Sequence, residues 1–209
     1  RGSSQEPPSP TMAKATAFNL LVLRAGRSSW DSDGRIVGDS DLPMCDEGRA
    51  EIAREIDELS GEGLSVILAA PAQLLRNGSG VKVRTLPGLA EISMGLWEGV
   101  LGSDLEERFP KNYRQWLVDP SSVKAPEGEA FGDAQDRVLR TLARALEKVK
   151  GDTPVIGVVA RPLASGIIRC FVEDRPTADL WERSKVCVSR GRITREALMG
   201  VLESSGARA

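Results

Sequence analysis

Two arginines stand directly after runs of apolar residues, and their positions predict an anion-binding site. Arg24 follows the run Leu20–Leu23, and Arg161 follows the run Val155–Ala160. Apolar runs of this length are typical of strands that are buried on both faces of a sheet. The carboxyl ends of such strands are where α/β proteins bind ligands, and guanidinium groups suit phosphate or carboxylate oxygens. We therefore expect Arg24 and Arg161 to converge at one edge of the sheet.

Side chains that could act as nucleophiles or metal ligands are scarce in this chain. Its 209 residues include no histidine, and its three cysteines, Cys45, Cys170 and Cys187, are too few and too widely spaced for a disulfide framework or a metal site. We expect them to be reduced and to pack in the interior. Ser28 lies near the first strand, but no base that could deprotonate it is evident. No other motif indicates a metal or a cofactor, so we expect neither.

The apolar pattern predicts the elements that must position these arginines. Amphipathic helices separate the two apolar runs, which favours a three-layer α/β/α sandwich with a mostly parallel sheet and both runs as adjacent central strands. The predicted strands are Leu20–Leu23, Ser65–Ala69, Val81–Leu86, Val155–Ala160 and an edge strand at Lys185–Ser189. The longer predicted helices are one from Asp46 with Ile52, Ala53, Ile56 and Leu59 facing the core, one from Phe131 to Val149, one after Arg161 that ends near Asp174, and one capped by Thr194. Shorter helices are predicted at Asp104–Phe109, Tyr113–Leu117 and Leu180-Trp181.

Composition and charge exclude several classes of protein. The net charge of −2 gives no electrostatic footprint for nucleic acid. The longest apolar runs fall short of the about 18 residues that a membrane-spanning helix needs, so we expect no membrane partner and a cytoplasmic location. Residues 1–16 are predicted to be a disordered leader. Residues 17–209 are predicted to form a single domain with a small helical insertion around residues 102–128.

Two segments carry a family resemblance. The first strand ends in Arg24-Ala25-Gly26, and the segment from Leu89 to Gly99 reads Leu-Ala-Glu-Ile-Ser-Met-Gly-Leu-Trp-Glu-Gly. They resemble the Arg-His-Gly signature and the Leu-x-Glu-Ile-x-x-Gly-x-Trp-Glu-Gly segment of the histidine phosphatase superfamily, also called phosphoglycerate mutase-like. The loop between strand and helix is similar as well, at Trp30, Gly34, Arg35, Gly38, Asp41 and Pro43.

The resemblance implies a role for five positions, the first of which is Arg24, one of two arginines that hold the phosphoryl group. In the family, the histidine of the signature carries the phosphoryl group, and Ala25 occupies its place here. The arginine after the second strand, which grips the same group, is replaced by Leu74. The family's general acid is matched by Glu91. The position of the second histidine is Arg161 when counted from the strand, which we favour, and Ala164 when counted back from the following helix.

Of the five groups that the family uses, this chain therefore keeps Arg24 and Glu91. The leading hypothesis is a catalytically inactive homologue that acts as a binding or regulatory module, with an anion pocket formed by Arg24, Arg161 and Glu91. Its ligand would be a phosphorylated small molecule or protein, and the oligomeric state stays open. One alternative is a weak or altered phosphatase or phosphomutase that uses Glu91 without a histidine nucleophile. Another is a purely structural subunit whose pocket is a relic.

Overall fold

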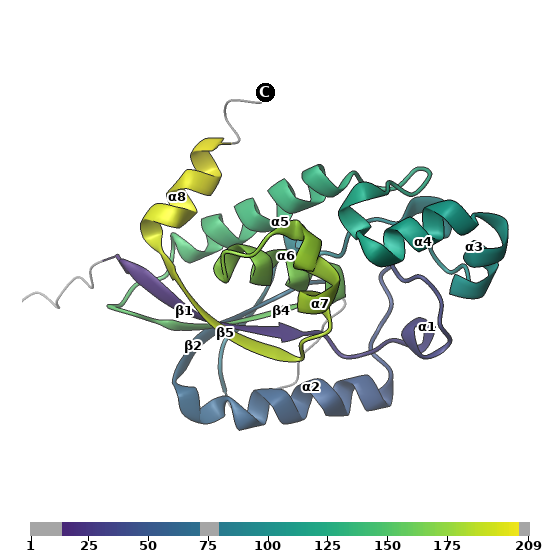
Figure 1. The fold of residues 1–209 in the computed structure, drawn as a ribbon. Coiled ribbons are helices and arrows are strands. Elements are labelled where there is room, and N and C mark those ends of the chain that lie inside the picture. The colour runs from purple at the N-terminus through teal and green to yellow at the C-terminus, as the bar shows by residue number, and fades with distance from the viewer. Residues whose placement is uncertain (1–13, 72–79, 205–209) are drawn as a thin grey trace, which may run out of the picture.

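The computed structural model describes residues 14–71 and 80–204, and Figure 1 shows how its helices and strands are arranged. Five strands form one sheet in the order β3-β2-β4-β1-β5. The strands are β1 (Ala17–Arg24), β2 (Leu64–Ala69), β3 (Val83–Thr85), β4 (Val155–Ala160) and β5 (Val188–Thr194). The helices are α1 (Ser29–Ser32), α2 (Asp46–Glu58), α3 (Gly102–Arg108), α4 (Pro110–Val118), α5 (Phe131–Leu146), α6 (Pro162–Val172), α7 (Leu180–Ser184) and α8 (Arg195–Ser204).

The sheet is mostly parallel, and its two most apolar strands are neighbours away from its edges. Strand β1 pairs in parallel with β4, and β2 pairs in parallel with both β4 and β3. Only β5 runs antiparallel, at the edge beside β1. The register places Arg24 opposite Ala160, the last residues of β1 and β4. Because both strands end at this level, Arg24 and Arg161 leave the sheet at the same edge.

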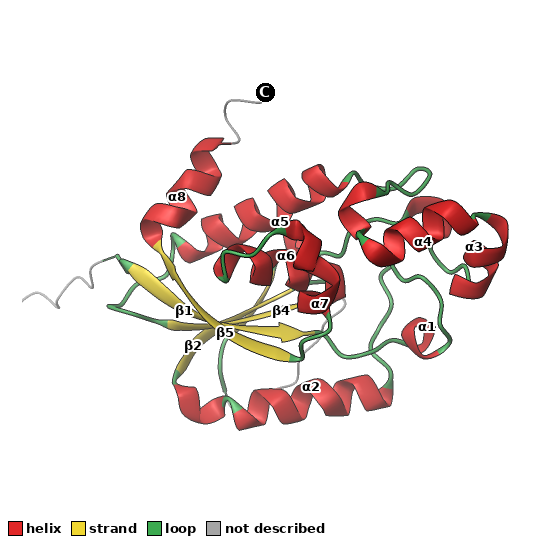
Figure 2. Ribbon diagram, viewed as in Figure 1, coloured by secondary structure: helices red, strands yellow, loops and turns green. Residues whose placement is uncertain are grey.

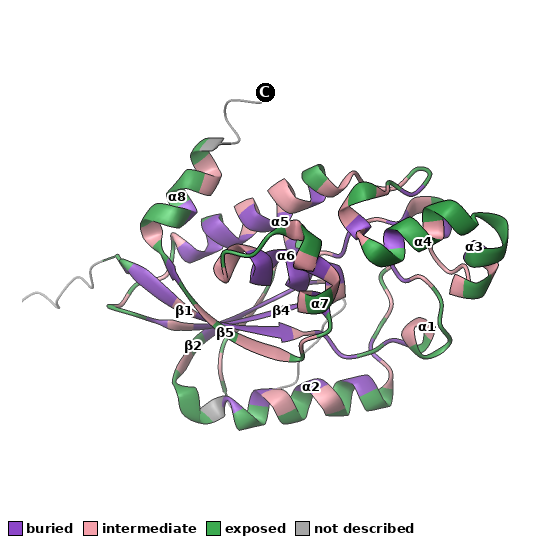
Figure 3. Ribbon diagram, viewed as in Figure 1, coloured by how far each residue is buried: buried purple, intermediate pink, exposed green. Residues whose placement is uncertain are grey.

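Helices cover both faces of the sheet, which confirms the predicted α/β class. Helix α2 lies on one face, whereas α5, α6 and α8 lie on the other (Figures 1 and 2). Each interface buries its own apolar cluster, and Figure 3 shows the buried positions gathered along the strands and on α5 and α6. Alternate residues of β1 point into opposite clusters, as strand geometry requires. Leu20 and Val22 belong to the cluster under α5 and α6. Leu21 and Leu23 belong to the cluster under α2.

The predicted core face of α2 needs one correction. Ile52, Ile56 and Leu59 are buried, as predicted, but Ala53 is exposed. The stripe follows the spacing of four and then three residues from Ile52, and Ala53 stands about 100° around the helix from it. The helix begins at Asp46, with acidic side chains in its first turn that suit the positive end of the helix dipole.

Helices α3 and α4 form a lobe beyond the carboxyl end of β1 (Figure 1). The Trp116 ring of α4 meets the Trp97 ring at a centroid distance of 6.2 Å and the Trp181 ring of α7 at 4.9 Å, both edge to face. The Trp181 indole N–H also donates to the carbonyl oxygen of Trp116 at 2.7 Å. This aromatic cluster joins the lobe to the sheet domain.

The expected leader and cysteine burial also need correction. Lys14 makes an isolated β-bridge with Lys150, and Ala15 is fully buried, so residues 14–16 belong to the fold and the predicted leader is too long. All three cysteines are free, but Cys187 is exposed because it lies in the turn that leads into the edge strand β5. Within the described residues, no helix has the length and apolar character needed to span a membrane.

Candidate functional site

A pocket of about 180 Å³ opens where β1 and β4 end. We call it the arginine pocket, and it is lined by Arg24, Ala25, Gly26, Arg27, Asp31, Arg161 and Pro162. The two arginines predicted to converge therefore contribute to one pocket. Ala25 follows Arg24 and also lines the pocket, and its N–H donates to the carbonyl oxygen of Ala160 at 2.8 Å.

Beside the arginine pocket, two glycines, Gly26 and Gly48, lie in close backbone contact. A Cβ atom on Gly26 would lie 2.0 Å from the carbonyl oxygen of Gly48, and one on Gly48 would lie 2.2 Å from that of Arg27. No side chain fits at such distances, so the loop after β1 packs backbone to backbone against the first turn of α2. This contact fixes the direction in which the chain leaves the sheet next to Ala25.

Arg24 lines the arginine pocket without an ion pair to any carboxylate of the described residues, unlike Arg27 and Arg161. Its backbone N–H donates to the carbonyl oxygen of Cys187 at 2.8 Å, and its Nη2 lies 3.8 Å from the Cys187 Sγ. A thiol is a weak acceptor, so it does little to neutralise the guanidinium group. Arg27, by contrast, is exposed and pairs with Glu51 at 2.5 Å. Arg24 is therefore the group best placed to receive an anion.

Arg161 is 5% exposed and is partly neutralised by Asp31. Its Nη2 donates to the carbonyl oxygen of Leu42 at 3.2 Å, whereas its Nη1 lies 3.6 Å from the Asp31 Oδ2, too far for a good hydrogen bond. The same Oδ2 accepts from the backbone N–H of Ser28 at 2.7 Å and from its hydroxyl group at 2.5 Å. The Nη1 group of Arg161 thus retains donor capacity toward the pocket.

Sequence reasoning missed Asp31, although a signal for it was present. Ser28 and Asp31 form a capping box at the start of α1, the pattern in which the first and fourth residues cap each other's backbone N–H. The pattern Ser-x-x-Asp could have predicted that pair. The Ser28 hydroxyl is fully buried and donates to the Asp31 carboxylate within this cap, and Ser28 does not line the arginine pocket.

Glu91 does not lie in the arginine pocket. Its side chain is buried, and its Oε1 accepts from the N–H groups of Ile92 at 2.9 Å and Ala164 at 2.8 Å, while its Oε2 accepts from that of Leu163 at 2.8 Å. Leu163 and Ala164 belong to the first turn of α6, so Glu91 caps this helix from outside. Burial raises the pKa of Glu91, against the opposing effect of these N–H groups and of Arg161.

Of the predicted anion pocket, Arg24 and Arg161 share one pocket. Asp31 is the carboxylate that forms an ion pair with Arg161, and Glu91 interacts with Arg161 through its charge without an ion pair. Of the two candidates for the second histidine position, Arg161 presents its side chain to the arginine pocket, whereas Ala164 contributes a backbone N–H to Glu91. Leu74 lies outside the described residues. No group of three or more potential metal ligands occurs in the part of the chain that the structure describes.

Residues 20–199 match the family model of the histidine phosphatase superfamily (branch 1). Phosphoserine phosphatase 1 of Hydrogenobacter thermophilus is 26% identical over 144 residues, which cover 66% of this chain and 68% of that protein. The protein named "Probable phosphoglycerate mutase GpmB" of Serratia proteamaculans is 26% identical over 158 residues, with coverages of 72% and 73%. The match to the longer "Bifunctional protein Rv2228c" of Mycobacterium tuberculosis covers only 45% of that protein, at 27% identity.

Solved structures confirm the fold. The alpha-ribazole phosphatase of Shigella flexneri superimposes with a TM-score of 0.64 at 22% identity, covering 79% of this chain and 84% of that one. YhfR of Bacillus stearothermophilus gives a TM-score of 0.69 at 23% identity, with coverages of 78% and 84%. Identities this low establish a common architecture, and the chemistry has to be argued from the residues of the pocket.

Proposed function

The chain belongs to the histidine phosphatase superfamily, and from that premise we propose that it is a catalytically inactive member that binds an anion in the arginine pocket. The observation that carries the proposal is the lining of this pocket, which brings Arg24 and Arg161 together with Ala25, the residue that stands in place of the family's nucleophilic histidine. The pocket thus offers cationic donors for phosphate or carboxylate oxygens but no nucleophile. The proposal includes a phosphorylated small molecule or protein as ligand and a cytoplasmic location.

The loss of catalysis follows from what covalent phosphoryl transfer requires. A nucleophilic nitrogen must accept the phosphoryl group, cations must hold its three oxygens, and an acid must protonate the leaving group. The chain contains no histidine, so it cannot form the family's phosphohistidine. Removal of a covalent nucleophile typically lowers the rate by several powers of ten.

A weak phosphatase that uses Glu91 and water is the second candidate, and one observation favours it. Burial raises the pKa of Glu91, as a general acid requires. However, both carboxyl oxygens of Glu91 accept backbone N–H groups, and Glu91 lines a neighbouring pocket and not the one that contains Arg24. Turnover of a phosphate monoester would distinguish this candidate from the inactive binding module.

Replacement of Arg24 by alanine is expected to weaken the binding of sulfate or phosphate about tenfold to a hundredfold. The reason is that a hydrogen bond to a charged group contributes about 1.5–3 kcal/mol. Calorimetric titration of wild type and Arg24→Ala with sulfate measures the change. Arg190→Ala is the matched control, because Arg190 is exposed on β5 and pairs with Glu62. Identical titrations for Arg24→Ala and wild type would make the pocket a relic and favour a purely structural role.

The purified protein is expected to form no acid-labile phosphoenzyme and to hydrolyse phosphate monoesters no faster than buffer does. Incubation with a labelled small phosphoryl donor, followed by acid treatment, tests for the covalent intermediate. The variant Ala25→His is expected to remain inactive as well, because Leu74 and Arg161 or Ala164 still stand where the family has its second gripping arginine and second histidine. Acid-labile label on the wild-type protein, or turnover well above the buffer rate, would refute the inactive assignment.

A further inference from the structure

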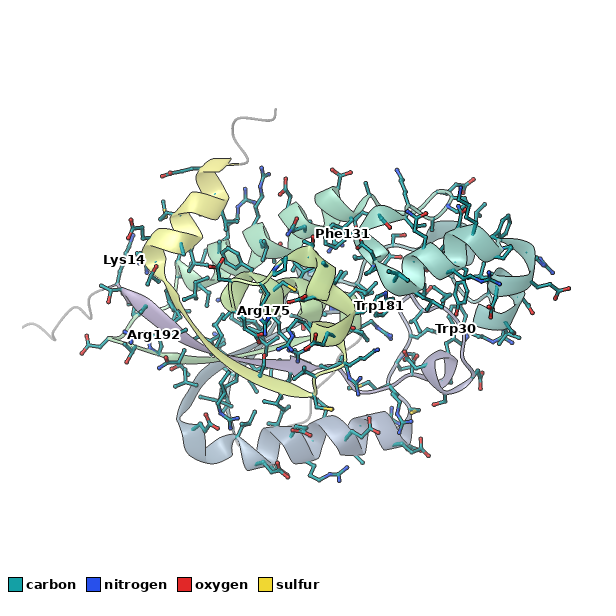
Figure 4. All side chains as sticks on the ribbon, in the orientation of Figure 1. Lys14, Trp30, Phe131, Arg175, Trp181 and Arg192 are labelled. Carbon is teal, nitrogen blue, oxygen red and sulfur yellow. The ribbon has the colours of Figure 1, made fainter. Side chains whose placement is uncertain are left out.

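A second pocket of about 180 Å³ adjoins the arginine pocket and differs from it in chemistry. We call it the apolar pocket. Trp181 contributes to it from α7, next to the α3–α4 lobe (Figure 4), and Trp116 contributes from the lobe itself. Its apolar walls are completed by Ile36, Val37, Met94 and Leu163. Concave sites with aromatic and aliphatic walls and few polar groups are typical of small-molecule binding.

The two pockets are adjacent because both are lined by Asp31, Arg161 and Pro162. Arg161 forms part of this shared wall, and its Nη1 lies 3.6 Å from the carboxylate of Asp31. A donor at this position can contact an anionic group on one side while the rest of the ligand extends to the other. These shared residues therefore place a polar compartment directly beside an apolar one.

Charge is unevenly divided between the two compartments. The charged groups of the apolar pocket have partners: Glu91 accepts three backbone N–H groups, and Arg35 donates to the carbonyl oxygen of Gly99 at 2.7 Å. In the arginine pocket, Arg24 has no ion pair with any residue that the structure describes. A ligand that satisfies both compartments needs negative charge at one end only.

We propose that this chain binds an anionic group attached to a single apolar ring, with the anion at Arg24 and the ring in the apolar pocket. The inference rests on the proposed function, because it uses the same anion site. The size of the ring follows from the volume, since an engineered apolar cavity of about 150 Å³ in another protein accepts benzene. A phosphate monoester and a carboxylate share this chemistry, and the experiment below separates them.

The test compares four probes by calorimetric titration: inorganic phosphate, glycerol phosphate, phenyl phosphate and phenylacetate. Phenyl phosphate is expected to bind about tenfold to a hundredfold more tightly than inorganic phosphate, as burial of one aromatic group predicts. Glycerol phosphate is expected to bind no more tightly than inorganic phosphate, because its body is polar. If phenyl phosphate binds more tightly than phenylacetate, phosphate is the preferred anion. If phenylacetate binds more tightly than phenyl phosphate, carboxylate is preferred. Either result supports the inference, provided that the ring-containing probe binds more tightly than inorganic phosphate.

Two pocket-filling variants locate the ring. In Val37→Phe, phenyl phosphate is expected to bind no more tightly than inorganic phosphate, because the new ring occupies the apolar pocket. Met94→Phe provides the same test at a second wall, should Val37→Phe fail to fold in a urea titration. Val118→Phe is the control, since Val118 is 78% exposed on α4 and lines neither pocket.

The possible failures are distinguishable. If inorganic phosphate, glycerol phosphate and phenyl phosphate bind equally well, with a loss of affinity in Arg24→Ala, the inference is wrong and the anion pocket stands. If the preference for a ring persists in both filling variants, the ring binds elsewhere and the inference is also wrong. If none of the four probes binds, the inference and the proposed function fail together.

Discussion

Replacement of Arg169 by methionine is expected to lower the free energy of unfolding by about 3–5 kcal/mol, most of the stability of a marginally stable domain. Arg169 lies in α6 and is 0% exposed. Its guanidinium group makes five hydrogen bonds at 2.9–3.2 Å, to the hydroxyl groups of Ser165 and Ser189 and to the carbonyl oxygens of Val22, Arg183 and Cys187.

The expected loss is large because one side chain joins several elements. Its partners lie on β1, β5, α6 and the segment around α7, so the guanidinium group links the antiparallel edge of the sheet to the helices above it. Burial lowers the pKa of Arg169 to about 10, which leaves it charged at neutral pH. Methionine has a similar length but no donor, so all five hydrogen bonds are lost, while the carbonyl oxygens of Cys187 and Arg183 keep backbone donors from Arg24 and Val186. Each hydrogen bond that a charged group makes contributes about 1.5–3 kcal/mol.

Urea titration of Arg169→Met at neutral pH measures this loss. Arg169→Lys is expected to cost less, because an ammonium group can replace some of the five hydrogen bonds. The control is Arg190→Met, in which an exposed arginine is lost and stability should change by no more than about 0.5 kcal/mol. A change equally small in Arg169→Met would show that the hydrogen bonds of Arg169 are not needed for the fold.

The same network bears on the anion site. The backbone N–H of Arg24 and the Nη2 of Arg169 both donate to the carbonyl oxygen of Cys187, at 2.8 Å and 3.2 Å. The guanidinium group of Arg169 thereby fixes the strand tip from which Arg24 leaves the sheet. The positive charge of Arg24 also helps to lower the pKa of Arg169, so the two guanidinium groups lie close enough to interact. This buried charge strengthens the positive potential at the arginine pocket.

The central sheet was predictable because burial on both faces leaves a direct mark on the sequence. The runs Leu20–Leu23 and Val155–Ala160 could be recognised without knowledge of their partners, and their pairing as β1 and β4 followed from fold class. The start of the folded part of the chain was predicted less well. Ala15 is a single small residue without periodicity, and its complete burial depends on the later elements that cover it.

Site partners were harder to predict than site positions. Arg24 and Arg161 follow strands, so the sheet alone brings them to one pocket. The pairing of Arg161 with Asp31 depends on a loop path that no periodicity describes. Arg169 follows two isoleucines in a mostly apolar helix, and this contrast was a signal for a buried arginine that sequence reasoning did not use.

Replacement of Glu91 by leucine is expected to lower the free energy of unfolding by about 3–5 kcal/mol, since three buried N–H groups lose their acceptor. Two of these groups, those of Leu163 and Ala164, open α6, whose positive end also favours an acceptor at this position. Glu91→Gln keeps one acceptor oxygen and is expected to cost about 1–3 kcal/mol. Urea titrations measure both losses, with Glu107→Gln as the control, because Glu107 is exposed on α3.

The cost of Glu91→Gln is expected to depend on pH. Burial raises the pKa of Glu91 above its ordinary value of 4.5 in the folded state. A carboxyl group of this kind stabilises the fold most below its unfolded pKa, and this contribution is lost as the pH rises through the folded pKa. Glutamine does not titrate, so the stability difference between wild type and Glu91→Gln should be largest in acid and shrink as the pH rises. An equal difference at all pH values would show that Glu91 has the same pKa in both states.

The glutamine variant also separates the two functional candidates, because it removes the acid while retaining part of the helix cap. A general acid acts by giving up a proton, and glutamine cannot do so, so a phosphatase that depends on Glu91 would lose its turnover in Glu91→Gln. If Glu91 acts only as the cap of α6, the folded variant keeps the anion affinity of wild type and differs only in stability. Sulfate titration and phosphate-monoester turnover, measured on the same folded preparation, distinguish these outcomes. Wild-type turnover that disappears in Glu91→Gln would overturn the inactive assignment, whereas unchanged sulfate affinity with no turnover in either protein assigns Glu91 to the scaffold.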